Sequence, residues 1–139
     1  MAGIFVKDTD EIVINLFQAT DKDGKNYFEV DKAKLEDLLA NMGVSYEIQS
    51  YKVVFRKPCF KDMVEINSDM VSMSGVSNFK VNFLANRLKQ MAALIKAWDF
   101  KDDEGDLIPA IADNVDKLDP LVANLIAGEL DMQINTFAI

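Results

Sequence analysis

The chain has 139 residues, of which 50% are apolar and 27% are charged, values that are ordinary for one globular domain. It contains no histidine and a single cysteine, Cys59. This composition excludes an intrachain disulfide, imidazole-dependent catalytic triads and the usual zinc sites, although carboxylates or lysines could still act in catalysis. We therefore expect a soluble protein that is not an enzyme and that uses no metal or cofactor. The apolar runs are short and residues 1–10 lack the pattern of a secretory signal, so we expect neither a transmembrane helix nor secretion.

The net charge of −8 is concentrated near the carboxyl end. Residues 1–98 contain thirteen acidic and thirteen basic residues, whereas residues 99–139 contain ten acidic residues and two lysines. Nucleic-acid phosphates repel such a surface, so we do not expect nucleic acid as a partner. The acidic segment would suit a basic protein partner, but the simpler interpretation is that it keeps the surface solvated.

The amino half predicts short strands and one helix. An apolar, β-branched strand is expected over 11–17, followed by a turn over 20–26 and a second short strand over 27–30. Asp31 is a candidate N-cap for a helix that ends before a C-cap at Gly43. The expected apolar stripe of this helix consists of Leu35, Leu38, Leu39 and Met42.

The middle of the chain begins with the best strand pattern, over 46–57, which Pro58 ends. Helices are expected from Phe60 to about Ser72 and from about Asn78 to Trp98, with a break at Ser74-Gly75. The apolar stripe of the second helix steps by four and three residues through Leu84, Leu88, Met91, Ile95 and Trp98.

A polar turn over 102–106 and an extended step over 107–109 open the carboxyl end. Asp113 is a candidate cap for a short helix, and Asp119 with Pro120 predicts the start of a final helix. The expected fold class is therefore α+β, with short amino-terminal strands and a predominantly helical carboxyl-terminal half. We expect a single domain over 1–139, comprising a mixed strand and helix portion (1–58), a helical portion (59–132) and a flexible tail (133–139).

The turn that begins at Asp21 has some features of an EF-hand calcium loop. Such a loop needs oxygen ligands at positions 1, 3 and 5, a glycine at position 6 and a bidentate glutamate at position 12. Asp23 fits position 3, but position 5 is Lys25, position 6 is Asn26 and position 12 is Lys32. Because two ligands are replaced by cations, we interpret this segment as a hairpin turn and expect no metal site.

Methionine and acidic residues supply the candidate partner-binding site. Four of the seven methionines, Met63, Met70, Met73 and Met91, fall on two neighbouring predicted helices. Methionine side chains repack easily, so they can line an adaptable groove, but the simpler interpretation is that they fill the core. The candidate site residues are Met63, Met70 and Met91 for an apolar groove and Asp102, Asp103 and Glu104 for an acidic rim.

Five motifs follow one another in the second part of the chain. They are a strand with a "Phe-Arg-x-Pro" exit, a helix that ends in "Ile-x-x-Trp", an acidic glycine turn, a "Leu-Pro" step and a short capped helix that ends in "Leu-x-Pro", and the corresponding segments are 51–58, 94–100, 102–105, 107–109 and 113–120. In the order and spacing of these motifs, residues 46–130 resemble the tail assembly chaperones of long-tailed bacteriophages. No counterpart is recognised for residues 1–45.

The resemblance implies a chaperone that binds the helical, aggregation-prone tape measure protein in the host cell cytoplasm. It further implies that the protein helps recruit tail tube subunits and is then released, and that a longer frameshifted form exists in many relatives. A homo-oligomer is possible. Two alternatives stay open, namely a structural virion protein, such as a head–tail connector or tail subunit, and a calcium-binding module. Trp98 is expected to pack in the core beneath the 107–109 step.

Overall fold

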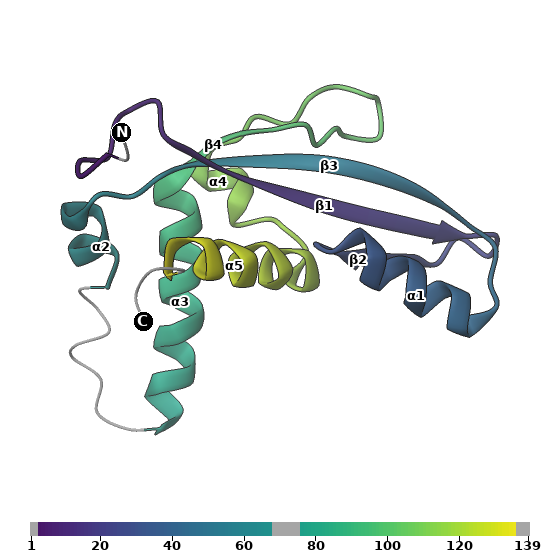
Figure 1. Cartoon of the computed structure of the whole chain (residues 1–139). Helices are drawn as coiled ribbons and strands as arrows, with labels where there is room; N and C mark the ends of the chain where they lie inside the picture. Colours follow the sequence, from purple (N-terminus) through teal and green to yellow (C-terminus); the bar gives the residue numbers. More distant parts are fainter. Residues whose placement is uncertain (1–2, 68–75, 136–139) are drawn as a thin grey trace.

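The structure, a computed structural model, describes residues 3–67 and 76–135, and it has a mixed α+β fold. A four-stranded antiparallel sheet has the strand order β2-β1-β3-β4. The strands are β1 (Glu11–Asp21), β2 (Asn26–Glu29), β3 (Tyr46–Arg56) and β4 (Ile95–Trp98). The helices are α1 (Lys32–Met42), α2 (Phe60–Asn67), α3 (Val76–Leu94), α4 (Ala112–Val115) and α5 (Pro120–Asn135). Figure 1 shows the long β1–β3 pair with the helices beneath it.

β1 is longer than the strand expected over 11–17, whereas β3 matches the strand expected over 46–57. β1 and β3 have eleven residues each and pair over their full length, from Glu11 opposite Arg56 to Asp21 opposite Tyr46. Side chains of a strand alternate between the two faces of a sheet. Alternate residues in the first half of β1 are buried against α5 and the end of α3. The main core contains Ile12, Ile14, Leu16, Val53, Phe55, Met91, Leu94, Trp98, Ile126 and Leu130.

A second, smaller core lies on the opposite face of the sheet. In the first half of β1 the buried residues have even numbers, ending with Leu16, whereas further along the strand the buried residue is the odd-numbered Ala19. Ala19 packs against Leu35 and Leu39 of α1. The ladder between β1 and β3 has no register shift, so the change from even-numbered to odd-numbered buried residues means that the buried face of the sheet changes. Long strand pairs twist along their length, and α1 and α5 therefore both lie below the strands in Figure 1.

Both expected ends of α1 are confirmed. The Asp31 carboxylate accepts the backbone N–H groups of Ala33 and Lys34, and Gly43 adopts a left-handed conformation with φ of 68°. The expected stripe is only half right, because Leu38 and Met42 are exposed. Only the residues that face Ala19 are covered, since α1 packs on the narrow end of the sheet where β2, β1 and β3 pair.

The helix expected to end at Trp98 ends at Leu94 instead. The chain then turns extended, and β4 pairs with β3 so that Val53 lies opposite Trp98. The backbone groups of residues 95–98 find partners along β3, which the local four-and-three spacing could not indicate. The carboxyl half therefore contains a strand as well as helices. The flexible tail expected over 133–139 is corrected for residues 133–135, because they belong to α5.

The remaining helix boundaries give mixed outcomes. Asp119 caps α5 as expected, since its carboxylate accepts the N–H groups of Leu121 and Val122. Asp113 does not cap α4, because that helix begins at Ala112 with no side-chain cap. α2 covers the first part of the helix expected over 60–72, and residues 68–72, 74–75 and 136–139 lie outside the described residues. In the described part of the chain, none of the helices combines the length and apolarity that crossing a membrane requires.

A two-point ion pair joins the end of β3 to the start of α2. Arg56 Nη1 donates to Asp62 Oδ2 at 2.7 Å, and Arg56 Nη2 donates to Asp62 Oδ1 at 3.2 Å. The backbone N–H of Cys59 donates to the same carboxylate at 3.0 Å. The hydrogen bonds from Arg56, followed by the one from Cys59, hold the pKa of the Asp62 carboxyl well below its usual range.

We expect Asp62→Asn to lower the free energy of unfolding at neutral pH by about 1 kcal/mol, since the pair is partly solvated. The pKa is lower in the folded state than in the unfolded state, so the carboxylate stabilises the fold at pH values above its unfolded pKa. That contribution is lost as the pH falls through the folded pKa. Urea unfolding should therefore show a constant difference between wild type and variant from about pH 8 to about pH 5, which shrinks below about pH 4. Arg56→Gln removes the other partner of the ion pair, so its stability should also lack the contribution that wild type loses at low pH. A stability difference between wild type and Asp62→Asn that persists unchanged to low pH would contradict the role assigned to this ion pair.

Candidate functional site

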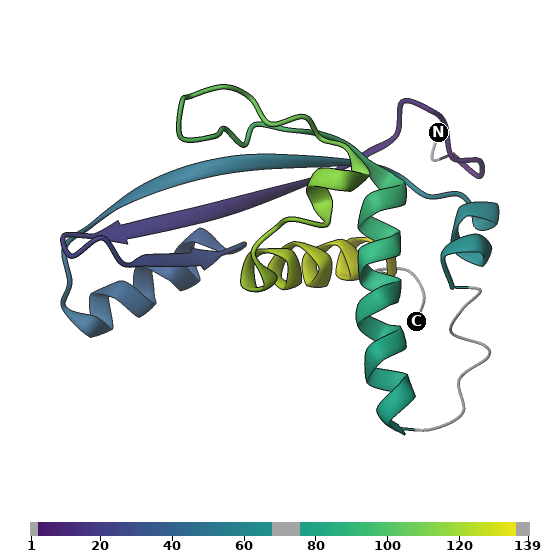
Figure 2. The same cartoon turned by 180° about the vertical axis from the view of Figure 1, so that it is seen from behind.

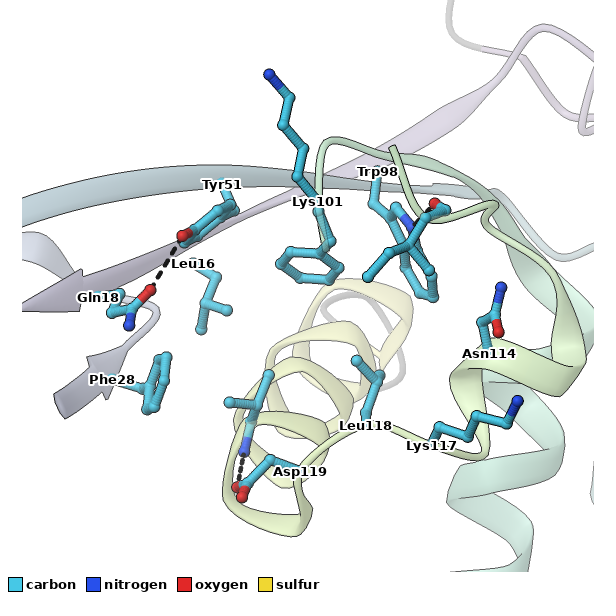
Figure 3. A pocket seen from close by; sticks show the side chains of 13 residues that line it. Leu16, Gln18, Phe28, Tyr51, Trp98, Lys101, Asn114, Lys117, Leu118 and Asp119 are labelled. Atoms are coloured by element: carbon cyan, nitrogen blue, oxygen red, sulfur yellow. Dashed lines mark hydrogen bonds between the residues drawn. The ribbon is translucent and has the colours of Figure 1, made fainter. Parts of the chain in front are cut away.

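A cavity lined mostly by apolar side chains lies on the inner face of the sheet, where the ends of several elements meet. It has a volume of about 410 Å³ and is open to solvent on one side. Figure 3 shows its walls, which come from β1, β2, β3, the end of β4 with the segment after it, α4, and the start of α5 with the link before it. We call it the aromatic pocket. Its lining side chains are Leu16, Gln18, Phe28, Tyr51, Trp98, Phe100, Lys101, Ile108, Asn114, Lys117, Leu118, Asp119 and Val122.

One wall of the aromatic pocket is a row of three rings. The ring centroids of Tyr51 and Phe100 are 5.3 Å apart, and those of Trp98 and Phe100 are 5.1 Å apart, both in tilted arrangements. The indole N–H of Trp98 donates to the carbonyl of Ile108 at 2.6 Å, as expected for packing beneath the 107–109 step. Such tilted pairs are favourable, so the wall is held in a defined shape.

The uncharged polar side chains that line the aromatic pocket, Gln18, Tyr51 and Asn114, all form hydrogen bonds within the protein. The Tyr51 hydroxyl donates to Gln18 Oε1 at 3.0 Å, and the Gln18 amide nitrogen donates to Asn26 Oδ1 at 3.0 Å. The amide nitrogen of Asn114 donates to the Pro109 carbonyl. The pocket therefore offers an apolar, aromatic surface rather than a constellation of free polar groups.

The charged residues at the rim point away from the cavity. In Figure 3 the amines of Lys101 and Lys117 extend outward, and the Asp119 carboxylate faces the first turn of α5, which it caps. Among the residues that the structure describes, no three histidine, cysteine or carboxylate side chains converge as they would around a metal ion. The chemistry that this site supports is the binding of an apolar group.

The methionines of the predicted groove do not meet at this pocket. Met63 is half-buried and lines a separate hollow of about 440 Å³ between the start of α2 and the end of α5, together with Phe60 and Ile134. Met91 is only 3% exposed, so it belongs to the main core and borders only a hollow of about 80 Å³. Met91 therefore does not line an open groove, because the main core covers the inner side of α3. Met70 and Met73 lie outside the described residues.

The predicted acidic rim is an exposed turn that lies far from Met63. Asp102, Asp103 and Glu104 form the tip of a hairpin over 100–108, seen above β3 in Figure 1. The Asp102 carboxylate accepts the N–H groups of Glu104 and Asp106, both at 2.9 Å, so part of its role is to shape the turn. The turn at Asp21 has the same design, because its carboxylate accepts two N–H groups in the following loop.

Sequence reasoning missed most of the aromatic pocket for one identifiable reason. With Trp98 placed at the end of a helix, Phe100 has no predicted relation to it. In an extended chain, residues two apart share a face, which brings these two rings together. The strand alternation of Tyr51, Val53 and Phe55 was a usable signal, since it places Tyr51 on the same face as the core.

The comparisons with known proteins return no match. No family model, curated protein or solved structure matches this chain.

Proposed function

We propose that this protein is a bacteriophage tail assembly chaperone that binds and solubilises the tape measure protein. The aromatic pocket is the observation that carries the proposal. Its volume falls in the range of about 300–1,000 Å³ that is common for binding pockets. Tyrosine and tryptophan in such a setting are the residues that most often dominate protein recognition. The sequence resemblance over 46–130 supplies the biological context, and the pocket supplies the surface.

The pocket suits apolar anchor residues on an amphipathic helix. Helical partners dock by laying side chains from one face into an apolar depression, and a tape measure protein offers many such faces. The acidic carboxyl-terminal region would then keep the complex solvated. In this proposal the protein acts as a single domain in the host cell cytoplasm, helps recruit tail tube subunits, and leaves before the tail matures.

We expect Leu118→Ser to reduce binding to the tape measure protein encoded in the same genome. Leu118 lines the pocket and is half-buried, so a serine there removes apolar contact area from the site. The affinity should fall about tenfold, as for a moderately important interface residue. Co-expression followed by centrifugation would show less tape measure protein in the soluble fraction than with wild type.

Leu107→Ser is the matched control. Leu107 is 59% exposed and lies nearby on the hairpin, but it does not line the pocket, so this variant should solubilise the partner as wild type does. Equal loss with both variants, or no gain in solubility with wild type, would contradict the proposal. Mass spectrometry of purified virions separates the alternative, because many copies per particle would identify a structural virion protein instead.

A further inference from the structure

The outer edge of β3 has no strand beside it over half of its length. β4 pairs only with Val53, Val54 and Phe55, whereas β1 pairs with the whole of β3 on the other side. In the part of the chain that the structure describes, residues Tyr46–Tyr51 therefore form a free sheet edge. Six residues at about 3.3 Å each give an edge of roughly 20 Å.

The hydrogen bonds of Lys52 show which residues of β3 point their backbone N–H and C=O groups toward this edge. The Lys52 N–H donates to Asp99 Oδ1 at 2.9 Å, and the Lys52 carbonyl accepts the Asp99 N–H at 3.3 Å. The backbone of Lys52 thus faces away from β1. Residues alternate in this respect along an antiparallel ladder, so the N–H and C=O groups of Ser50, Ile48 and Tyr46 also face outward.

Three of the features that usually prevent strand addition are missing from this edge, and its one charged side chain is that of Glu47. Proteins protect exposed edges with lysine, proline, bulges or covering segments. Tyr46–Tyr51 contains no lysine and no proline, and its pairing with β1 continues without a bulge. The edge is therefore chemically ready to accept another strand.

The hairpin over 100–108 runs beside the edge but leaves a space between them. Figures 1 and 2 show the hairpin alongside β3. The hollow between them has a volume of about 600 Å³. Its β3 wall consists of Gln49, Ser50 and Tyr51, and its hairpin wall consists of Asp99, Lys101, Asp102, Asp103 and Gly105.

The charges around the hollow indicate the chemistry of the occupant. The hairpin wall carries three aspartates and one lysine, and Glu47 lies on the edge strand itself. Opposite charges on neighbouring strands stabilise a sheet and like charges destabilise it. A second copy of this chain would bring its own Glu47 and acidic hairpin, whereas a basic segment would find complementary charge.

We propose that the outer edge of β3 binds an extended, lysine- or arginine-containing protein segment, which joins the sheet as a fifth strand in line with β4. Backbone hydrogen bonds to Ile48 and Ser50 provide affinity, and the aspartates of the hairpin select basic side chains. This site is not the aromatic pocket on which the proposed function rests. The proposal for the β3 edge holds whether or not the protein binds a tape measure protein.

A labelled, end-capped hexapeptide of alternating lysine and valine tests the site by fluorescence anisotropy. We expect it to bind with an affinity that falls as salt is raised, and we expect the equivalent glutamate–valine peptide not to bind. Hydrogen exchange of the Ile48 and Ser50 amides should slow in the complex. Equal binding of both peptides, or protection elsewhere in the chain, would overturn the proposal.

Ser50→Pro removes one outward N–H from the edge, while Ser50→Ala keeps it. The proline variant should weaken peptide binding at least about fivefold and the alanine variant less than about twofold. Asp103→Asn should also weaken binding, and Asp106→Asn, on the same hairpin but outside the hollow, should not. These two keep the test decisive if the proline variant fails to fold.

Leu118→Ser should leave peptide binding unchanged, which separates this site from the aromatic pocket. Analytical ultracentrifugation of the wild type tests whether a second copy of this chain binds the edge instead. Self-association that Ser50→Pro abolishes would show that a second copy, rather than a basic segment, occupies the edge.

Discussion

Trp98→Ala is expected to lower the free energy of unfolding by about 3–5 kcal/mol, the range for deleting a large aromatic side chain from a core. Trp98 is 7% exposed and is part of the main core. It contacts the ring of Phe100, and its N–H donates to the Ile108 carbonyl. The change therefore leaves a cavity, an unpaired carbonyl and a loosened hairpin. Urea unfolding followed by far-ultraviolet circular dichroism would measure it, and the chain would unfold if its total stability is near the lower end of the usual range.

Trp98→Phe distinguishes the contribution of the aromatic ring to stability from that of the hydrogen bond. It keeps an aromatic side chain against Phe100 but removes the donor to the Ile108 carbonyl, so we expect a loss of about 1–3 kcal/mol. The two variants should therefore differ clearly. If alanine and phenylalanine were equally tolerated, Trp98 would not be a core residue, and the wall of the aromatic pocket would have to be redrawn.

Leu39→Ala is expected to cost about 2–5 kcal/mol, although the core that contains Leu39 is small. Leu39 is fully buried with Leu35 and Ala19 between α1 and the sheet. Few other residues cover this face, so a cavity there has little surrounding structure that could move in to fill it. Chemical denaturation gives the total effect, and hydrogen exchange of α1 amides would show whether the helix opens before the rest of the chain.

Leu38→Ala is the matched control for this prediction. Leu38 is the preceding residue on α1 and is 49% exposed, so its truncation should change stability by less than about 0.5 kcal/mol. The same chemical change at adjacent positions then differs only in burial. Similar losses at both positions would mean that α1 packs in a different rotation from the one seen here.

The two proposed binding sites meet at Tyr51. Its ring forms part of the aromatic pocket, and its backbone ends the free edge of β3. A helix in the pocket and an extended segment on the edge could therefore come from one partner chain. The variants Leu118→Ser and Ser50→Pro act on one site each, so measuring both with the same partner would show whether the sites are used together.

Features that depend on neighbouring residues could be predicted from the sequence. Asp31 and Gly43 bound α1 as expected, and Asp119 starts α5, because a cap needs only a side chain and the N–H groups two or three residues away. The hairpin turns at Asp21 and Asp102 follow from the same short-range hydrogen bonding. The long alternating pattern of β3 was equally clear.

Features that depend on distant residues could not be predicted in this way. The spacing of Met91, Ile95 and Trp98 fits a helix, yet the chain leaves the helix after Leu94 because β3 offers backbone partners there. The sequence left open whether Met91 lines a groove or fills the core, and it is buried in the core, since only packing decides which face of a helix is covered. The aromatic pocket was missed for the same reason, because its walls come from segments far apart in the chain.

The sequence by itself therefore determined the positions of the turns, the caps at Asp31, Gly43 and Asp119, the α+β class, the acidic charge of the carboxyl end and the absence of imidazole chemistry. Each of these depends on composition or on residues within one turn. Tertiary structure alone decided that β1 buries its two halves on opposite faces, that residues 95–98 form a strand, and that Tyr51, Trp98 and Phe100 line one pocket. The physical reason is that burial and strand pairing are set by which distant segment supplies the contact. Local pattern fixes the periodicity of an element, but its partner fixes which face is covered and which edge stays free.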